Sequence, residues 1–142
     1  VYVTHLDHIS EKNRIEQWKT FNLVCEVNGD YKKKHIVLGD LNALTQTDYT
    51  LKRNMEIVAQ RRAAKLEDPT SQLMDLIANQ GYHDVAQYSA CTTPTSRFNT
   101  RIDYILLSHY CDVTHANNVQ VIDTKDASDH LPVVCEINVL CF

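Results

Sequence analysis

Hydrophobic and polar positions along the chain follow two different periods, which separate predicted strands from predicted helices. Val1 to His5 alternates apolar and polar residues, which predicts a strand. Ile36 to Gly39 is a continuous apolar run, typical of a strand that is buried on both faces. Three later segments are also predicted to be strands: Arg101 to Ser108, Asn118 to Ile122 and Leu131 to Val139.

Helical spacing appears between the first two strands and again after the second. Apolar residues between Ile15 and Cys25 recur at helical intervals, with Ser10 as the predicted N-cap and Asn28-Gly29 as the stop. A polar stretch from about Leu51 to Leu66 is predicted to be a second helix. A third, shorter helix with one apolar face is predicted to end at Gly81.

Strands and helices interleave along the chain, which predicts a layered α/β fold. Tyr88 to Asn99 is rich in Thr, Ser and Pro and is predicted to be an exposed loop. Asp40 follows one predicted strand directly, and Asp129 and His130 precede the last strand. Functional groups collect at such strand ends because the loops there are supported by a rigid frame. These strand ends are therefore the predicted functional region.

Composition and charge narrow the class of protein. The 142 residues are 44% hydrophobic and 23% charged, which is ordinary for one globular domain, and no apolar run approaches the length of a membrane span. The net charge of −4 argues against a protein that coats nucleic acid, but not against a small phosphate site that uses a metal ion. Five cysteines without a C-x-x-C pair disfavour a disulfide framework or a zinc site, and predict an intracellular protein, cytoplasmic or nuclear.

Chemically active side chains are concentrated in a few short segments. Carboxylates are the ligands that Mg²⁺ prefers, and a carboxylate that faces a bound water can act as a general base. A carboxylate beside an imidazole raises the pKa of the ring, and an Asn amide donates to oxygens on phosphorus. Phosphoester hydrolysis needs these groups, and four segments supply them: Thr4-His5-Leu6-Asp7, Gly39-Asp40-Leu41-Asn42-Ala43, Arg101-Ile102-Asp103-Tyr104-Ile105-Leu106 and Ser128-Asp129-His130-Leu131-Pro132-Val133.

Each segment taken alone also has a purely structural interpretation. Asp-x-Asn after a strand is usually a turn or a helix cap, and a lone Thr-His-Leu is more often structural. Ser-Asp-His-Leu-Pro fits a loop that leads into an edge strand at Pro132. Asp103 is different, because a carboxylate inside an apolar strand needs a partner.

Together and in this order, the four segments resemble the active-site motifs in the C-terminal half of the endonuclease/exonuclease/phosphatase (DNase I-like) superfamily. The resemblance runs from Tyr2 to Ile137, with about sixty residues between the second and third motifs and about twenty-five between the third and fourth. It implies an α/β fold that is half of a four-layer sandwich with the N-terminal half absent, so that residues 1–142 are the C-terminal portion of a single domain.

The resemblance implies a catalytic role for each matching residue. His5 would hydrogen-bond the scissile phosphate, and Asp40 would position or deprotonate the attacking water. Asn42 would hold a phosphate oxygen. Asp103 would pair with the last histidine, His130, which would contact the phosphate. If the motifs form one site, we expect these side chains and that of Asp129 to converge at one rim of a sheet.

Metal and substrate contacts follow from the same resemblance. Asp129 and Asp40 are the implied ligands of Mg²⁺, with Mn²⁺ as the alternative. Arg101, together with Asn42 and His5, is the predicted contact to substrate. The superfamily's N-terminal half supplies an Asn and a Glu, the latter a principal metal ligand, and neither can be assigned in this chain.

The absent half has three explanations: a fragment, an incomplete gene model, or a shortened protein that binds rather than cuts. We expect the missing N-terminal half to be a partner of this chain, because half a sandwich exposes more apolar surface than a monomer tolerates. We therefore expect weak Mg²⁺ binding, or none, from the chain alone. Arg14 and Gln17 match Arg-x-x-Gln in many members and are interpreted as structural supports.

The leading hypothesis is a Mg²⁺-dependent hydrolase that cleaves phosphodiester bonds by in-line attack of water. Nucleic acid is the favoured substrate, because Tyr49, Arg97, Phe98 and Arg101 offer stacking and phosphate contacts. A phospholipid head group or an inositol phosphate is the alternative substrate. The rival class is a binding module that keeps the fold without the chemistry, against which the intact set of motif residues argues.

Overall fold

The structure is a computed structural model that describes residues 1–88, 93–112, 116–124 and 127–138. Strands and helices alternate along it, which confirms the predicted α/β class. The elements are β1 (Tyr2–His5), α1 (Glu11–Val27), β2 (Ile36–Asp40), the 3₁₀ helix η1 (Gln46–Asp48), α2 (Leu51–Ala63), α3 (Gln72–Asn79), β3 (His83–Asp84), α4 (Val85–Tyr88), β4 (Asp103–Leu107), β5 (Ala116–Val121) and β6 (Val133–Ile137).

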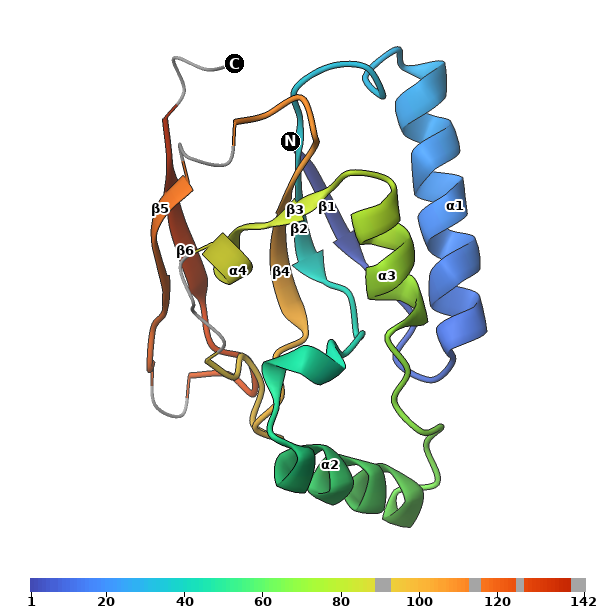
Figure 1. Ribbon diagram of the computed structural model, residues 1–142, viewed down its shortest axis with the longest axis vertical. Helices are drawn as coiled ribbons and strands as arrows, with labels where there is room; N and C mark the ends of the chain where they lie inside the picture. Colours follow the sequence, from blue (N-terminus) through green and yellow to red (C-terminus); the bar gives the residue numbers. More distant parts are fainter. Residues whose placement is uncertain (89–92, 113–115, 125–126, 139–142) are drawn as a thin grey trace.

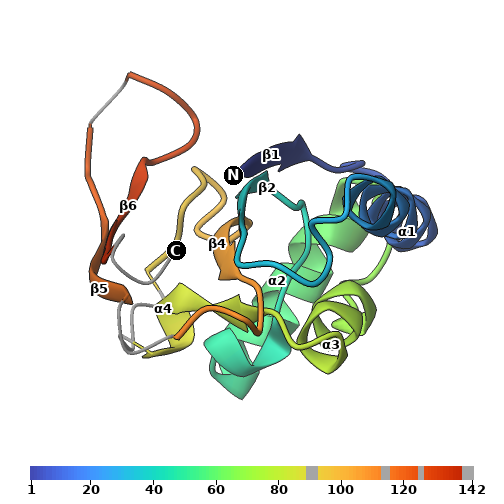
Figure 2. The same cartoon turned by 90° about the horizontal axis from the view of Figure 1, so that it is seen from above.

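A four-stranded sheet with the strand order β1-β2-β4-β3 lies at the centre. β1 and β2 are parallel, and β4 is antiparallel to both β2 and β3. β5 and β6 form a separate antiparallel pair. Figures 1 and 2 show α1 and α3 along one face of the central sheet and the β5–β6 pair over the other. The described part of the chain is thus layered, with α2 beyond one end of the sheet (Figure 1).

The alternation of side chains along β4 builds the two hydrophobic clusters on either side of the sheet. Tyr104 and Leu106 pack with Trp18 in the cluster under α1 and α3. Ile105 and Leu107 belong to the second cluster, which β5 and β6 cover. Successive residues of a strand point to opposite faces, so a strand with both faces covered is apolar at every position. This explains the continuous apolar run that follows Asp103.

Helix α1 begins and ends where the sequence predicts. Ser10 accepts a hydrogen bond from the backbone N–H of Asn13, and Gly29 adopts φ +69° just after the helix, a left-handed conformation that glycine takes readily. Trp18 is fully buried, and its indole N–H donates to the side chain of Gln80 at 2.7 Å. This contact joins α1 to the end of α3.

Several boundaries differ from the prediction. α2 ends at Ala63 rather than Leu66, because Lys65 adopts φ +56° and interrupts the helical run. β5 begins at Ala116 rather than Asn118. β4 and β6 lie within their predicted ranges, and the predicted end of the last strand at Val139 lies outside the described residues. η1, β3 and α4 were not predicted.

The predicted loop from Tyr88 to Asn99 is exposed only in part. Residues 89–92 lie outside the described part of the chain. Thr95 and Ser96 are buried, and Ser96 forms an isolated β-bridge with His130. The prediction of a fully exposed loop was therefore wrong here, because this bridge places the segment beside the strand-end loop that contains His130.

Three cysteines in the described residues, Cys25, Cys111 and Cys135, are free thiols, whereas Cys91 and Cys141 lie outside the described residues. No helix in the described ranges combines the length and the apolar character that crossing a membrane requires. At the edge strand β1, Val1 and Val3 are exposed. They form a short apolar strip next to the covered part of the sheet.

Candidate active site

Three side chains that the sequence places at three separate strand ends are neighbours in the sheet. His5 pairs with Asp40 across β1 and β2, and Asp40 pairs with Asp103 across β2 and β4. Directly paired residues point to the same face of a sheet. The imidazole and the two carboxylates therefore lie in a row, at the edge where β1 and β2 end and β4 begins.

His130 completes this row from the loop before β6. Its Nδ1 atom lies 3.0 Å and 3.1 Å from the two carboxylate oxygens of Asp103, and its Nε2 atom lies 3.9 Å from Asp40 Oδ2. On the other side, His5 Nε2 lies 3.6 Å from the same Asp40 oxygen. Two imidazoles thus flank one carboxylate, and His5, Asp40, Asp103 and His130 converge at one rim of the sheet as predicted.

Burial and neighbouring charges change the pKa of two of these groups. Burial raises the pKa of the Asp40 carboxyl; the backbone N–H of Asn42 lowers it, and the charge of Asp103 raises it further, so the net shift is upward. For His130, burial works against the charged ring, but the hydrogen bond and charge of Asp103 outweigh burial and raise its pKa. A more basic carboxylate beside a more readily protonated imidazole suits proton transfer at a phosphate.

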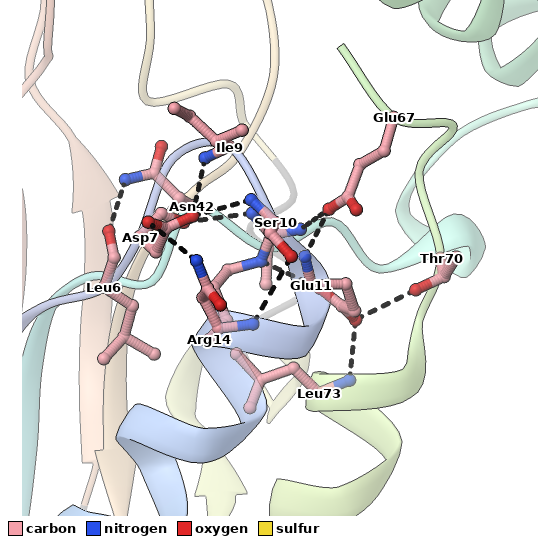
Figure 3. Close-up of polar contacts among 12 residues, drawn as sticks. Leu6, Asp7, Ile9, Ser10, Glu11, Arg14, Asn42, Glu67, Thr70 and Leu73 are labelled. Atoms are coloured by element: carbon pink, nitrogen blue, oxygen red, sulfur yellow. Dashed lines mark hydrogen bonds and ion pairs between the residues drawn. The ribbon is translucent and has the colours of Figure 1, made fainter.

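Asn42 connects the loops that follow β1 and β2. Its backbone adopts φ +49°, a left-handed conformation that Asn tolerates, and its N–H donates to Asp40 Oδ1 at 2.8 Å. Its side-chain amide donates to the carbonyl of Leu6 at 3.0 Å (Figure 3). A primary amide has two N–H groups, so this side chain carries a second donor.

Gly39 explains how β1 and β2 approach so closely just before the site. Its φ is +143°, and a β-carbon at this position would lie 1.8 Å from the carbonyl oxygen of Thr4. Any other residue would push the two strands apart. The glycine of the Gly-Asp-x-Asn segment is thus required by the contact that sets His5 beside Asp40.

A buried ionic cluster holds the loop after His5. Arg14 is 2% exposed, contacts Glu11 at 2.8 Å and Glu67 at 2.6 Å, and donates to the carbonyl of Asp7 at 3.0 Å (Figure 3). The side chain of Gln17 accepts from the N–H of Asp7 at 2.7 Å. Arg14 and Gln17 contact the backbone next to the site rather than the site itself, as the structural interpretation of these two residues requires.

Arg101 was predicted to contact substrate, and the structure corrects this. Its side chain is 2% exposed and pairs with Asp48 at 2.7 Å and Asp84 at 2.8 Å. Its guanidinium carbon also lies 4.4 Å from the centre of the Tyr104 ring. A buried arginine needs such partners. Here the guanidinium connects η1, β3 and β4, so its charge stabilises the fold and does not face a ligand.

The groups that can hold a metal ion differ in one member from the implied set. In the described part of the chain, ligand atoms of Asp40, Asp103 and His130 lie within 4.8 Å of one another. Asp129 is not in this group, and its half-exposed carboxylate lies 3.8 Å from Arg97. Two carboxylates close together in a partly buried edge are a donor set that fits a divalent metal ion.

A cavity of about 690 Å³ adjoins the site and shares Asn42, Asp129 and His130 with it. Its far wall is formed by α2, a largely polar helix whose sequence carries none of the site motifs. Of the residues named as nucleic-acid contacts, Arg97 and Phe98 line this cavity. Tyr49 does not, and its hydroxyl instead accepts the backbone N–H of Arg101 at 2.8 Å.

The sequence matches no protein-family model, and no curated protein resembles it significantly in sequence. Solved structures do resemble its fold. A mannosyl-6-phosphatase from Bacteroides thetaiotaomicron matches with a TM-score of 0.60 and 18% identity, over 96% of this chain and 49% of that one. A conserved protein of unknown function from Enterococcus faecalis matches with a TM-score of 0.58 and 18% identity, over 96% and 48%.

An endonuclease/exonuclease/phosphatase family protein, also from Bacteroides thetaiotaomicron, matches with a TM-score of 0.50 and 14% identity. The match covers 95% of this chain and 48% of that protein. The predicted resemblance to this superfamily is thus confirmed at the level of the fold. The chain spans about half the length of the solved structures that it matches, as expected for half of the sandwich.

Proposed function

We propose that this chain carries the phosphate-binding edge of a metal-dependent phosphoesterase, a hydrolase that cleaves phosphodiester bonds. One observation carries the proposal: Asp40, Asp103 and His130 converge at a single sheet edge, with His5 beside Asp40. A scaffold for binding alone has no need of two carboxylates between two imidazoles. The fold shared with phosphatase-type structures supports the same class of reaction.

Each side chain has a role that its surroundings suit. Asp40 has a raised pKa and takes the proton of the attacking water. His130, oriented and charged through Asp103, contacts a phosphate oxygen. The free N–H of Asn42 donates to a second phosphate oxygen, and the exposed His5 contacts the phosphate from the β1 side.

A divalent ion, Mg²⁺ with Mn²⁺ as the alternative, would be held by the carboxylates of Asp40 and Asp103, with the charged His130 beside them as a contact to phosphate. When bound, such an ion offsets negative charge on the phosphoryl oxygens and makes a bound water more acidic. Asp129 remains our proposed additional ligand, since its carboxylate is half exposed next to His130 and its contact with Arg97 is long.

Nucleic acid is the substrate we propose first, because Arg97 and the exposed Phe98 lie beside the phosphate-binding edge. A phosphate monoester is the second candidate, favoured by the fold shared with a mannosyl-6-phosphatase. A phospholipid or inositol phosphate ester is a further alternative within the same chemistry.

The matched structures are about twice as long as the region they share with this chain. We therefore propose the hydrolytic activity for the protein at its full natural length. We propose that a complementary half, in the same polypeptide or in another, covers the apolar strip at Val1 and Val3 and completes the metal site.

The test uses the protein at its full natural length, with an oligonucleotide, bis(p-nitrophenyl) phosphate, mannose 6-phosphate and sphingomyelin as substrates. We expect diester cleavage with Mg²⁺ and its loss in EDTA. Cleavage of mannose 6-phosphate alone would favour the monoesterase, and cleavage of sphingomyelin alone the lipid enzyme. Failure to cleave any of the four, or cleavage that EDTA leaves unchanged, would reject a metal-dependent phosphoesterase.

A further inference from the structure

The cavity beside the site is continuous with the phosphate-binding edge. Asn42 and His130 belong to both, so an ester whose phosphate contacts these residues has its organic part next to the cavity or inside it. The volume of about 690 Å³ is in the usual range for small-molecule sites. The side chains that line the cavity therefore determine which organic group the site can accept.

The floor of the cavity is aliphatic. Leu44 and Ile57 are buried, and Leu66 and Ile102 extend the same surface. These aliphatic side chains offer no hydrogen-bond partner to a sugar or inositol hydroxyl that lies against them, and each unpaired buried hydroxyl is costly. A flat ring with apolar faces loses nothing there. The floor thus favours an aromatic ring over a polyhydroxylated one.

The rim offers a stacking surface that is held in place. The Phe98 ring is 63% exposed, and the guanidinium carbon of Arg97 lies 4.9 Å from its centre. Arg53, on α2, donates to the backbone carbonyls of Phe98 and Asn99 at 2.9 Å and 3.2 Å. These contacts fix the loop, so the ring is positioned before a ligand arrives.

Charge and hydrogen-bonding groups complete the lining. Arg53, Arg61 and Arg97 line the cavity with one carboxylate, Asp129, so positive charge exceeds negative charge in this lining although the chain as a whole carries −4. The excess favours an anionic ligand. Gln60 and Asn99 are exposed in the wall, and their amides match the donors and acceptors on the edge of a base.

We propose that this cavity binds the base of a nucleotide whose phosphate lies at Asp40 and His130, with the base stacked on Phe98. The substrate class is then a nucleotide-containing phosphoester. This inference rests on the proposed function for the position of the phosphate, and it adds the group that the protein recognises beside that phosphate.

The test compares two ligands that differ only in the base, AMP and ribose 5-phosphate, by NMR titration of the protein at its full natural length in EDTA, which also prevents turnover. We expect AMP to bind more tightly. Phe98→Ala should weaken AMP binding by about 5- to 150-fold and leave ribose 5-phosphate unchanged. Phe98→Trp should retain AMP binding, and Met55→Ala, an exposed apolar residue of α2 outside the cavity, is the matched control.

Equal affinities for the two ligands, no detectable AMP binding, or an AMP affinity that Phe98→Ala leaves unchanged would each overturn the proposal. Phe98→Leu keeps an apolar side chain and should also lose AMP affinity, which separates stacking from loss of the loop's structure. Adenosine, which has no phosphate, should shift resonances around Phe98 even if Asp40 proves irrelevant to hydrolysis. That result would distinguish a failed phosphoesterase assignment from a failed base site.

Discussion

His130 Nδ1 lies 3.0 Å from one carboxylate oxygen of Asp103 and 3.1 Å from the other, which joins the loop before β6 to the first residue of β4. An ionised carboxylate only accepts hydrogen bonds, so the contact requires the proton on Nδ1. The ring then presents Nε2 toward Asp40, 3.9 Å from its Oδ2 atom. Asp103 thus decides which nitrogen of His130 faces the site.

Replacement of Asp103 by Asn should lower the pKa of His130. The hydrogen bond and charge of Asp103 are the principal causes that raise this pKa against burial. We expect the pH titration of the His130 ring protons, followed by NMR in EDTA, to move to lower pH in Asp103→Asn. The alkaline limb of the pH–rate profile should move in the same direction, because the charged ring is lost earlier as the pH rises.

The same pKa shift links His130 to stability. A pKa raised above its ordinary value of 6.5 adds stability that is fully present below that pH and is lost as the pH rises through the folded-state pKa. Asp103→Asn should therefore lose more stability at acid pH than at alkaline pH through this residue. Asp75→Asn, at an exposed position on α3, is the control and should shift neither curve. An unchanged His130 titration would show that Asp103 does not tune the ring.

Substitution of Gly39 tests the close approach of β1 and β2. A β-carbon would lie 1.8 Å from the Thr4 carbonyl oxygen, so we expect Gly39→Ala to lower the free energy of unfolding by at least about 2 kcal/mol in urea titrations. Gly29→Ala is the control: its φ is also positive, but nothing lies within 4 Å of the added carbon. It should cost only about 1 kcal/mol. Equal losses would mean that the contact with Thr4 is unimportant.

Arg101→Ala should reduce stability, because it leaves the carboxylates of Asp48 and Asp84 buried without their cation. A loss of about 3–5 kcal/mol is expected for such a buried pair. Arg62→Ala removes an exposed pair with Asp68 and should leave the free energy of unfolding nearly unchanged. Chemical denaturation measures both. A stable Arg101→Ala protein with a raised KM would restore the substrate contact predicted from the sequence.

We expect a metal ion to bind residues 1–142 at the sheet edge that carries Asp40. Mn²⁺ should broaden NMR signals of Asp40, Asp103 and His130 first, and Asp40→Asn should abolish this broadening. We expect the affinity of residues 1–142 to be weaker than that of the protein at its full natural length. Broadening centred on Asp30, a surface carboxylate paired with Lys33, would place the metal elsewhere.

The sequence predicts the strand ends of the site but not how they pair. His5, Asp40 and Asp103 follow or begin apolar strands, so their positions at one edge could be inferred. Their register, which sets each beside the next, depends on long-range pairing that no local pattern contains. His130 was found through the motif, and its contact with Asp103 through the need of a buried carboxylate for a partner.

Two kinds of structural feature could not be predicted from the sequence. β3 and η1 have two and three residues, too few for a period, so Asp84 and Asp48 were not recognised as partners of Arg101. α2 is polar along most of its length and resembles a solvated helix, although Ile57 and Arg53 line the cavity. Its position beyond the sheet edge follows from tertiary packing rather than from its own sequence.

The kcat of Asp40→Asn shows whether this carboxylate is the catalytic base. The protein at its full natural length would be assayed with bis(p-nitrophenyl) phosphate at saturating Mg²⁺, with Asp75→Asn as the matched carboxylate control. We expect kcat to fall by about 10²–10⁴ in Asp40→Asn, with the thermal midpoint and KM little changed, and to stay at the wild-type value in Asp75→Asn. A folded Asp40→Asn protein with wild-type kcat would contradict this role.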